Sequence, residues 1–357
     1  MTDRLDHFRA AIERATRDKT PLQLVGSGSK HWYGEALQGA PLDTRGHAGV
    51  VAYDPAELVI TARCGTPLAE IEATLAEQGQ MLAFEPPHFG PGATLGGCVA
   101  AGLSGPRRQA AGALRDFMLG VQLLDGQGRV LNFGGQVMKN VAGYDVARLL
   151  PGSLGVLGLI LQVSLKVLPK PFAEATLRFE LPETEALSRL NQWGGQPLPI
   201  SASAWQYGVL HLRLSGAEAA VAGACAKLGG ERIAEADCAA FWQGLREQTA
   251  PFFAEREADE PLWRLALPST AQPVALPGAQ LIEWGGGQRW WRSDAPAAQV
   301  RTLAEQAGGH ATLWRGGDHA VGVFTPLAAP LLQIQRRLKA AFDPAGVFNP
   351  GRLYPAL

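Results

Sequence analysis

The spacing of hydrophobic residues in the first part of the chain changes repeatedly between that of a helix and that of a strand. Leu5, Phe8 and Ile12 fall on one face of a charged stretch, which predicts an amphipathic N-terminal helix. Short apolar runs then predict strands, with a helix from 66 to 79 between the last two. The predicted strands are 22–25, 50–53, 58–63 and 81–84.

A hairpin and a core-facing strand follow. The DGQGR turn at 125–129 predicts a hairpin that joins 121–124 to 130–133. The apolar stretch 149–168 ends in strict alternation, which predicts a strand with one face toward a core. Pro169 and Pro171 would stop that strand and favour an extended connection, so we place a domain boundary there.

The second half predicts an antiparallel sheet with helices on one side, because strand and helix patterns recur loosely after the boundary. The predicted strands are 175–179, 209–214, 263–267, 281–284 and 321–324. A helix at 331–342 then leads into the tail FDPAGVFNPGRLY, which we expect to return to the first domain. We therefore predict an α+β protein with domains at 1–170 and 171–330 and a returning segment at 331–357.

Composition narrows the functional classes. The 357 residues include 32 basic and 33 acidic side chains, for a net charge of −1, so no general field attracts nucleic acid or an anionic membrane. The four cysteines lack the spacing of a zinc or iron–sulfur site and are expected to be reduced cytosolic thiols. We see neither a signal peptide nor a membrane-spanning stretch, so we expect a cytoplasmic protein, with a place at the inner face of the membrane left open.

Glycine is unusually dense between Pro91 and Pro169, and a strand runs into the GSGSK loop at 26–30. Glycine lets main-chain N–H groups approach phosphate oxygens closely, so both segments indicate a site for a large anionic cofactor. The spacings of a Rossmann fingerprint, a P-loop, a zinc peptidase and an α/β-hydrolase are all missing. A dinucleotide held by loops remains.

In order along the chain, GSGSK, ATLGG, the Arg115-Asp116 pair, KNVAGYD and GSLGVLG resemble the FAD-binding domain of the vanillyl-alcohol oxidase and p-cresol methylhydroxylase (PCMH) type. Over nearly the whole chain, KNVAGYDVARL, LWRLALP, IEWGGGQRWW, HATLWRGG and FDPAGVFNPGRLY resemble the E-subunit family of bacterial glycolate oxidase. This resemblance implies two α+β subdomains that sandwich FAD, and an antiparallel-sheet cap domain. It also implies a complex with a larger flavin-binding D subunit and an iron–sulfur F subunit.

The resemblance also implies which residues bind FAD. Those on the pyrophosphate would be Gly26, Ser27, Gly28, Ser29 and Lys30, with Thr94, Gly96, Gly97, Ser104 and Gly105 on the other side of the phosphates and ribose. Gly152, Gly155 and Ile160 would follow the adenine and the ribityl chain, and Lys139, Asn140 and Tyr144 would lie close to the isoalloxazine ring. An ordinary turn at 26–30, a close-packed helix at 94–105 and a plain core strand at Ile160 remain alternatives.

Some members of the wider family attach FAD through a histidine in the first loop. Here that loop ends at Lys30 and His31 comes one step later, so we expect non-covalent FAD. The histidine turn by which related dehydrogenases bind a metal is replaced by Gly316-Gly317-Asp318-His319, so we expect no metal site. The catalytic residue stays unassigned. Candidates are Tyr144 and the arginines Arg264, Arg289 and Arg315, since a guanidinium matches both oxygens of a carboxylate.

The resulting hypothesis is an FAD-binding subunit of a glycolate oxidase complex. It would oxidise a small 2-hydroxy acid, glycolate, to glyoxylate, or relay the electrons of that reaction to the iron–sulfur subunit. One alternative is a self-contained FAD-dependent 2-hydroxy-acid dehydrogenase. A second is a structural assembly subunit without flavin.

Overall fold

A computed structural model of the chain describes residues 2–135 and 145–357. Two compact units make up the chain, and each is described by itself. The first unit consists of Met1–Leu103, Ala113–Pro169 and Pro326–Leu357, and the second of Ser104–Gly112 and Lys170–Thr325.

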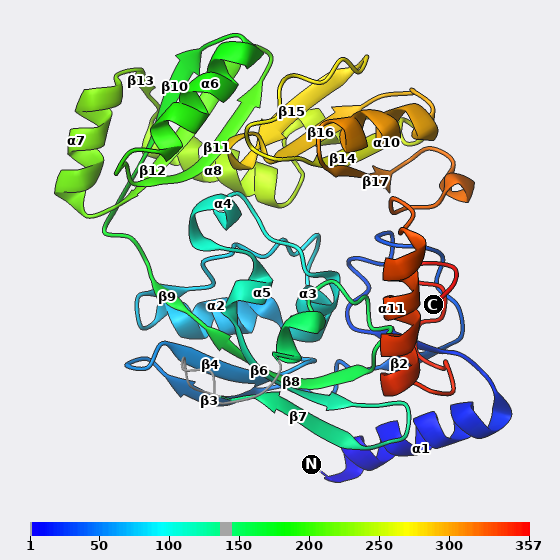
Figure 1. Cartoon of the computed structure of the whole chain (residues 1–357). Coiled ribbons are helices and arrows are strands. Elements are labelled where there is room, and N and C mark those ends of the chain that lie inside the picture. The colour runs from blue at the N-terminus through cyan, green and yellow to red at the C-terminus, as the bar shows by residue number, and fades with distance from the viewer. Residues whose placement is uncertain (1, 136–144) are drawn as a thin grey trace. The chain divides into compact units, whose positions relative to one another are not determined.

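A five-stranded antiparallel sheet forms the centre of the first unit, in the order β3-β4-β8-β6-β7. Figure 1 shows three short helices, α2, α3 and α5, on one face of this sheet. The strands are β3 (Val50–Asp54), β4 (Val59–Arg63), β6 (Met118–Leu124), β7 (Val130–Gly134) and β8 (Leu159–Lys166), and the helices α2 (Leu68–Ala76), α3 (Leu95–Ala101) and α5 (Leu114–Phe117). A small pair, β5 (Gln80–Met81) with β9 (Leu168–Pro169), and the 3-10 turn η1 (Ala147–Leu149) complete this part.

The N-terminal helix α1 (Thr2–Asp18) buries the face that its sequence predicts. Phe8 and Ile12 are almost fully buried in a core that also contains Leu22, Leu159 and Phe348. Leu22 belongs to β1 (Leu22–Val25), which pairs in parallel with β2 (Ala40–Asp43). This core therefore joins the N-terminal helix to the first strand and to a residue close to the chain's other end.

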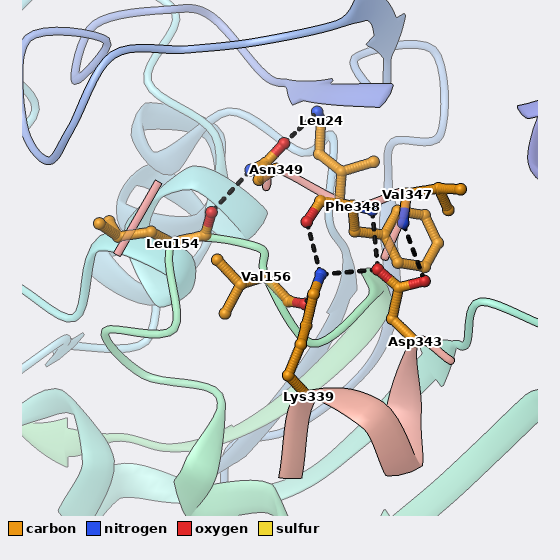
Figure 2. Close-up of polar contacts among 8 residues, drawn as sticks. All are labelled: Leu24, Leu154, Val156, Lys339, Asp343, Val347, Phe348 and Asn349. Carbon is orange, nitrogen blue, oxygen red and sulfur yellow. Dashed lines mark hydrogen bonds and ion pairs between the residues drawn. The ribbon is translucent and has the colours of Figure 1, made fainter. Parts of the chain in front are cut away.

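A buried ion pair fixes the C-terminal tail, which follows helix α11 (Ala329–Phe342) (Figure 2). The Lys339 ammonium donates to the Asp343 carboxylate at 2.6 Å and to the carbonyl oxygens of Val156 and Phe348 at 2.7 Å each. Asp343 in turn accepts hydrogen bonds from the amides of Val347 and Phe348. The three donors of the ammonium are therefore all used, as a buried charge requires.

The second unit is built on one eight-stranded antiparallel sheet, in the order β13-β10-β12-β11-β15-β16-β14-β17. Its strands are β10 (Ala173–Glu180), β11 (Ile200–Gln206), β12 (Val209–Gly216), β13 (Glu231–Arg232), β14 (Leu262–Ala266), β15 (Ala279–Glu283), β16 (Gln288–Arg292) and β17 (His310–Arg315). Its helices are α4 (Arg108–Ala111), α6 (Glu183–Gly194), α7 (Glu218–Leu228), α8 (Glu235–Arg246), α9 (Pro251–Ala254) and α10 (Ala297–Gln306), with 3-10 turns η2 (Trp284–Gly286) and η3 (His319–Val321).

Helices cover this sheet unequally. α6 and α7 share a hydrophobic core with β10 and β12, and α10 shares one with β14 and β17. On the opposite face of β10, the indole of Trp242 in α8 donates to Thr176 at 2.9 Å. Helices therefore contact both faces of the sheet, and not one face alone as predicted. The antiparallel pairing and the mixed α+β composition are as predicted.

Two predicted strands are wrong. The strand predicted at 81–84 is shorter and earlier, because β5 covers only Gln80–Met81. Residues 321–324 carry the apolar alternation of a strand, but the strand lies earlier, at β17, and η3 occupies 319–321. Gly316 and Gly317 have φ of +63° and +68°, which ends β17, and the Asp318 carboxylate accepts from the Ala320 amide to form the turn. Strands β2, β11, β13 and β16 were also missed.

None of the helices in residues 2–135 and 145–357 combines the length and apolar composition needed to cross a membrane.

Asp343→Ala is expected to lower the free energy of unfolding by about 3–5 kcal/mol, because it leaves the Lys339 ammonium buried without its counter-ion. Urea denaturation followed by circular dichroism measures the change. Glu13→Ala, at an exposed position of α1, is the matched control and should shift the free energy by no more than about 0.5 kcal/mol. Equal urea midpoints for the two variants would show that the pair does not hold the tail.

Candidate functional site

A cavity with about 800 Å³ of empty space, counting its open mouth, lies within the first unit. Most of its lining comes from four segments that are far apart in sequence: the end of β1 with the loop after it, the start of α3, the start of β8 with the turn before it, and the C-terminal tail. The residues that line it are Leu24, Val25, Gly26, Ser27, Gly28, Ser29, Lys30, His31, Leu37, Thr44, Cys64, Thr94, Gly96, Gly97, Ala100, Ala101, Leu154, Gly155, Gly158, Leu159, Ile160, Asn349 and Arg352.

The loop after β1 bends tightly because of its glycines. Gly28 has a φ of +80°, a conformation that favours glycine, and its carbonyl accepts from the His31 amide at 3.0 Å. A Cβ on Gly26 would lie 2.5 Å from the Thr94 hydroxyl. Glycine at position 26 therefore lets the loop and the start of α3 approach each other across the cavity.

Thr94 is the N-cap of α3, where its hydroxyl accepts from the Gly97 amide at 3.3 Å. The Gly96 amide instead donates to the Cys64 carbonyl at 2.7 Å, and a Cβ at Gly96 would lie 2.8 Å from the Cys64 Cβ. Gly96 thus serves the close packing of α3 on β4, while Thr94 and the 26–30 loop form the polar wall.

Two cations line the cavity, Lys30 and Arg352, and no carboxylate does among the described residues. The Lys30 ammonium donates to the His88 carbonyl at 3.1 Å and lies 5.5 Å from the centre of the Phe89 ring. Burial lowers the pKa of Arg352 to about 10, which still leaves it charged at neutral pH. The cavity is therefore suited to an anion.

The C-terminal tail connects two walls of the cavity. Asn349 accepts from the Leu24 amide at 2.8 Å and donates to the Leu154 carbonyl at 2.6 Å (Figure 2). Arg352 donates to the His31 carbonyl at 2.8 Å and also to the carbonyls of Tyr33 and Glu35. Asn349 thereby fixes strand β1, which leads into the 26–30 loop, and Arg352 fixes the segment at 31–35, which follows that loop.

Cys64 contributes a thiol to the cavity wall. Its burial raises the pKa to about 12, so the thiol stays protonated at physiological pH and is a poor nucleophile. Burial also raises the pKa of Cys98, on the buried side of α3, to about 12.

Most of the sequence-predicted cofactor residues line this one cavity: Gly26, Ser27, Gly28, Ser29, Lys30, Thr94, Gly96, Gly97, Gly155 and Ile160. Gly152 belongs to the first unit but does not line the cavity, and its amide donates to the carbonyl of Val99 in α3. Ser104 and Gly105 fall in the second unit. Lys139, Asn140 and Tyr144 lie outside the described residues.

Sequence reasoning missed several residues of the wall. Two of them, Asn349 and Arg352, belong to the NPGR part of the tail. A third is Thr44, whose hydroxyl donates to the Val25 carbonyl at 3.0 Å. The tail was expected to return to the first domain, but polar residues between its prolines and glycines were not read as part of a site.

The arginines proposed to meet a substrate carboxylate have different surroundings. Arg289 is fully buried and donates to the carbonyls of Gly286, Gln272 and Ala271 at 3.3, 2.9 and 2.5 Å, so its guanidinium serves the main chain rather than an open site. Arg315 is half-buried at the end of β17, where burial and the Arg256 charge lower its pKa to about 10. Across residues 2–135 and 145–357, no three His, Cys, Asp or Glu side chains gather as a metal site would require.

Comparison with known proteins identifies the family. A family model described as an FAD binding domain matches residues 3–134. The glycolate oxidase subunit GlcE of Escherichia coli (strain K12) is 50% identical over 360 residues, which cover 100% of both chains. The chain belongs to the GlcE family.

Two more distant proteins are similar over most of this chain. The glycolate oxidase subunit GlcD of Bacillus subtilis (strain 168) is 24% identical over 73% of this chain and 68% of its own. A solved structure of alkyldihydroxyacetonephosphate synthase has a TM-score of 0.64 at 15% identity, over 96% of this chain and 74% of the other, and shows the fold alone. The predicted PCMH-type α+β fold is confirmed.

The cavity of this GlcE-family chain fits the phosphates of FAD. It combines a glycine-rich bend, hydroxyl groups at Ser27, Ser29 and Thr94, and the positive charges of Lys30 and Arg352. A side chain at position 26 would occupy space next to Thr94, and one at position 28 would occupy space next to His31, so either would narrow the cavity. Hydroxyl groups and positive charges beside a glycine-rich bend are compatible with a bound pyrophosphate.

Arg352→Gln is expected to weaken FAD binding about tenfold or more, because the segment at 31–35 loses its charge-assisted hydrogen bonds to the tail. Titration of the apoprotein with FAD, followed by flavin fluorescence, measures the dissociation constant. Arg337→Gln, at an exposed position on α11, is the control and should bind FAD as the wild type does. Unchanged affinity in Arg352→Gln would contradict a role for the tail in the site.

Proposed function

We propose that this chain is the FAD-binding subunit of a glycolate oxidase complex, an FAD-dependent oxidoreductase that acts on the CH–OH group of 2-hydroxy acids. One observation carries the proposal. A cavity with a glycine-rich loop and two cations lies in a chain that is 50% identical, from end to end, to a glycolate oxidase subunit. The first unit would be the cofactor domain, with 331–357 returning to it, and the second unit the cap.

In this proposal the 26–30 loop binds the pyrophosphate, with Lys30 and Arg352 balancing its charge. Thr94 and Gly97 face it from the start of α3, and the main chain at Gly155 and Ile160 follows the rest of the cofactor. When bound, FAD accepts two electrons from a substrate and can release them singly. The residues of this chain position the cofactor and neutralise its phosphates.

FAD binding is proposed to be non-covalent. The Cys64 thiol in the cavity wall is protonated because its pKa is about 12, and His31 lies just beyond the loop that carries the attaching histidine in other members of the wider family. The fit of the cavity rests on hydrogen bonds and charge, neither of which requires a covalent link.

The proposed partners are a larger flavin-binding D subunit and an iron–sulfur F subunit. The electrons leaving the flavin require an acceptor, and a one-electron centre in a partner subunit suits a flavin that releases electrons singly. All four cysteines are free thiols, which favours the cytoplasm as the compartment. A location at the inner face of the membrane would follow from the partners rather than from this chain.

A visible spectrum of the purified chain distinguishes the proposal from its alternatives. Flavin absorbance with no bleaching by glycolate, followed by bleaching when the partner subunits are added, supports the subunit function. Bleaching by glycolate with the isolated chain would favour a self-contained 2-hydroxy-acid dehydrogenase. A folded chain that takes up no flavin would leave a structural assembly role.

Gly28→Asp is expected to abolish FAD retention in a folded protein, because it brings a carboxylate against the phosphates. Gly28→Asn is a matched control with the same shape and no charge, and both residues tolerate a positive φ better than other side chains do. We expect the asparagine variant to retain more flavin. Absorbance at the flavin bands and circular dichroism give the two readouts, and full flavin content in Gly28→Asp would overturn the assignment of the loop.

Acid precipitation of the holoprotein is expected to release all of its flavin into the supernatant, because no bond holds it. The supernatant absorbance and the intact mass of the precipitated chain measure the distribution. Flavin fluorescence that stays with the chain in denaturing electrophoresis would contradict non-covalent binding.

A further inference from the structure

A second cavity, with about 1080 Å³ of empty space including its mouth, lies within the second unit. Its floor is made by two neighbouring strands, where Arg264 and Ala266 of β14 pair with Thr312 and His310 of β17. Alternate residues of a strand share a face, so these four side chains lie on the side opposite Leu265, which packs in the core under α10. The floor is therefore a defined polar patch on one sheet face.

Two arginines from separate segments converge on the wall of this cavity. The Arg108 guanidinium carbon lies 4.4 Å from the centre of the Trp284 ring, and that of Arg264 lies 5.3 Å from the same centre. Because both guanidinium carbons lie close to the same ring centre, the distance between the Arg108 and Arg264 charges cannot exceed the sum of these two distances. No carboxylate lines the cavity among the described residues.

Aromatic rings surround the Arg264 guanidinium. Trp290 and Trp314 lie 5.8 and 5.3 Å from it, in addition to Trp284. Its Nε donates to the Gln288 amide oxygen at 2.7 Å, which orients the guanidinium plane. Arg264 is partly buried beside these rings, so its charge acts more strongly on an anion than that of a fully exposed arginine would.

The backbone at Trp284 is held in an unfavourable conformation. Its φ is +54°, which is unusual for a bulky residue, and the side chain is buried. The indole donates to the Gly105 carbonyl at 3.1 Å, and the next amide, that of Gly285, donates to the Ser203 hydroxyl at 2.9 Å. A strained residue that is locked in place at the wall of a cavity is typical of functional sites.

We propose that this cavity binds the carboxylate of a small 2-hydroxy or 2-oxo acid between Arg108 and Arg264. The inference deepens the proposed function, on which it rests for the choice of acid, by assigning the substrate class to named residues. A guanidinium matches both oxygens of a carboxylate, and two of them neutralise its charge.

The rest of the wall favours a small organic acid over inorganic phosphate. Thr312 and His310 offer hydrogen-bonding groups on the floor, and desolvation and the Arg264 charge lower the pKa of His310, which favours its neutral form. These groups suit the hydroxyl or keto oxygen next to a carboxylate. Ala266 and the Trp284 ring present apolar surface, which suits carbon atoms better than the charged oxygens of a phosphate.

The test is a titration of the flavin-loaded protein with glycolate, glyoxylate and oxalate, followed by tryptophan fluorescence and by the thermal unfolding midpoint. Ethylene glycol serves as a neutral analogue and inorganic phosphate as a second anion. We expect saturable binding of the acids and none of ethylene glycol. Binding of phosphate as tight as that of glycolate would overturn the carboxylate class, and the absence of saturable binding by any acid would overturn the site.

Arg108→Gln and Arg264→Gln are each expected to raise the dissociation constant about tenfold or more. Arg264→Lys keeps the charge and loses the two-pronged geometry, so it should weaken binding less than Arg264→Gln does. Arg232→Gln, at an exposed position of β13 in the same unit, is the matched control and should bind as the wild type does. Wild-type affinity in both glutamine variants would overturn the proposal.

Flavin content is measured in each sample. A protein that carries flavin but binds no acid contradicts this inference alone, whereas a folded protein without flavin contradicts the proposed function.

Discussion

The buried pair of Lys339 and Asp343 is the interaction on which the cavity of the first unit depends. A buried ammonium is stable only when each of its donors has a partner, and here the partners are the carboxylate and two carbonyls. One carbonyl, from Val156, belongs to the turn before β8, and the other, from Phe348, belongs to the tail. The requirement to satisfy one charge therefore places two distant segments beside each other.

The position of the tail then determines the cavity. With Phe348 fixed, Asn349 connects β1 to the turn at Leu154, and Arg352 holds the segment that follows the glycine-rich loop. Glycine at 26 allows the loop to approach the start of α3, and glycine at 96 allows α3 to pack against Cys64, but neither glycine holds these segments in place. Main-chain freedom and side-chain anchoring thus make separate contributions to one site.

Local patterns predicted much of this structure. The buried face of α1, the strands β6 to β8 and the grouping of the 26–30 loop with Thr94 all followed from residue spacing or from family motifs. The failures have physical causes. The apolar alternation at 321–324 gave no sign that the strand ends earlier, at Gly316 and Gly317. The sequence around Gly96 likewise gave no sign that its amide donates to the Cys64 carbonyl. Asn349 and Arg352 each bond to a residue more than 300 positions away, Leu24 and His31, which no local pattern encodes.

The distance along the chain between Leu24 and Asn349 has a consequence for biosynthesis. The hydrogen bond between them spans 325 residues, so it cannot form until nearly the entire polypeptide has been translated. A nascent chain on the ribosome can build the central sheet of the first unit while one wall of its cavity is still missing. If FAD binds in this cavity as proposed, its loading would be a late event in the maturation of the chain, after the tail has emerged and docked.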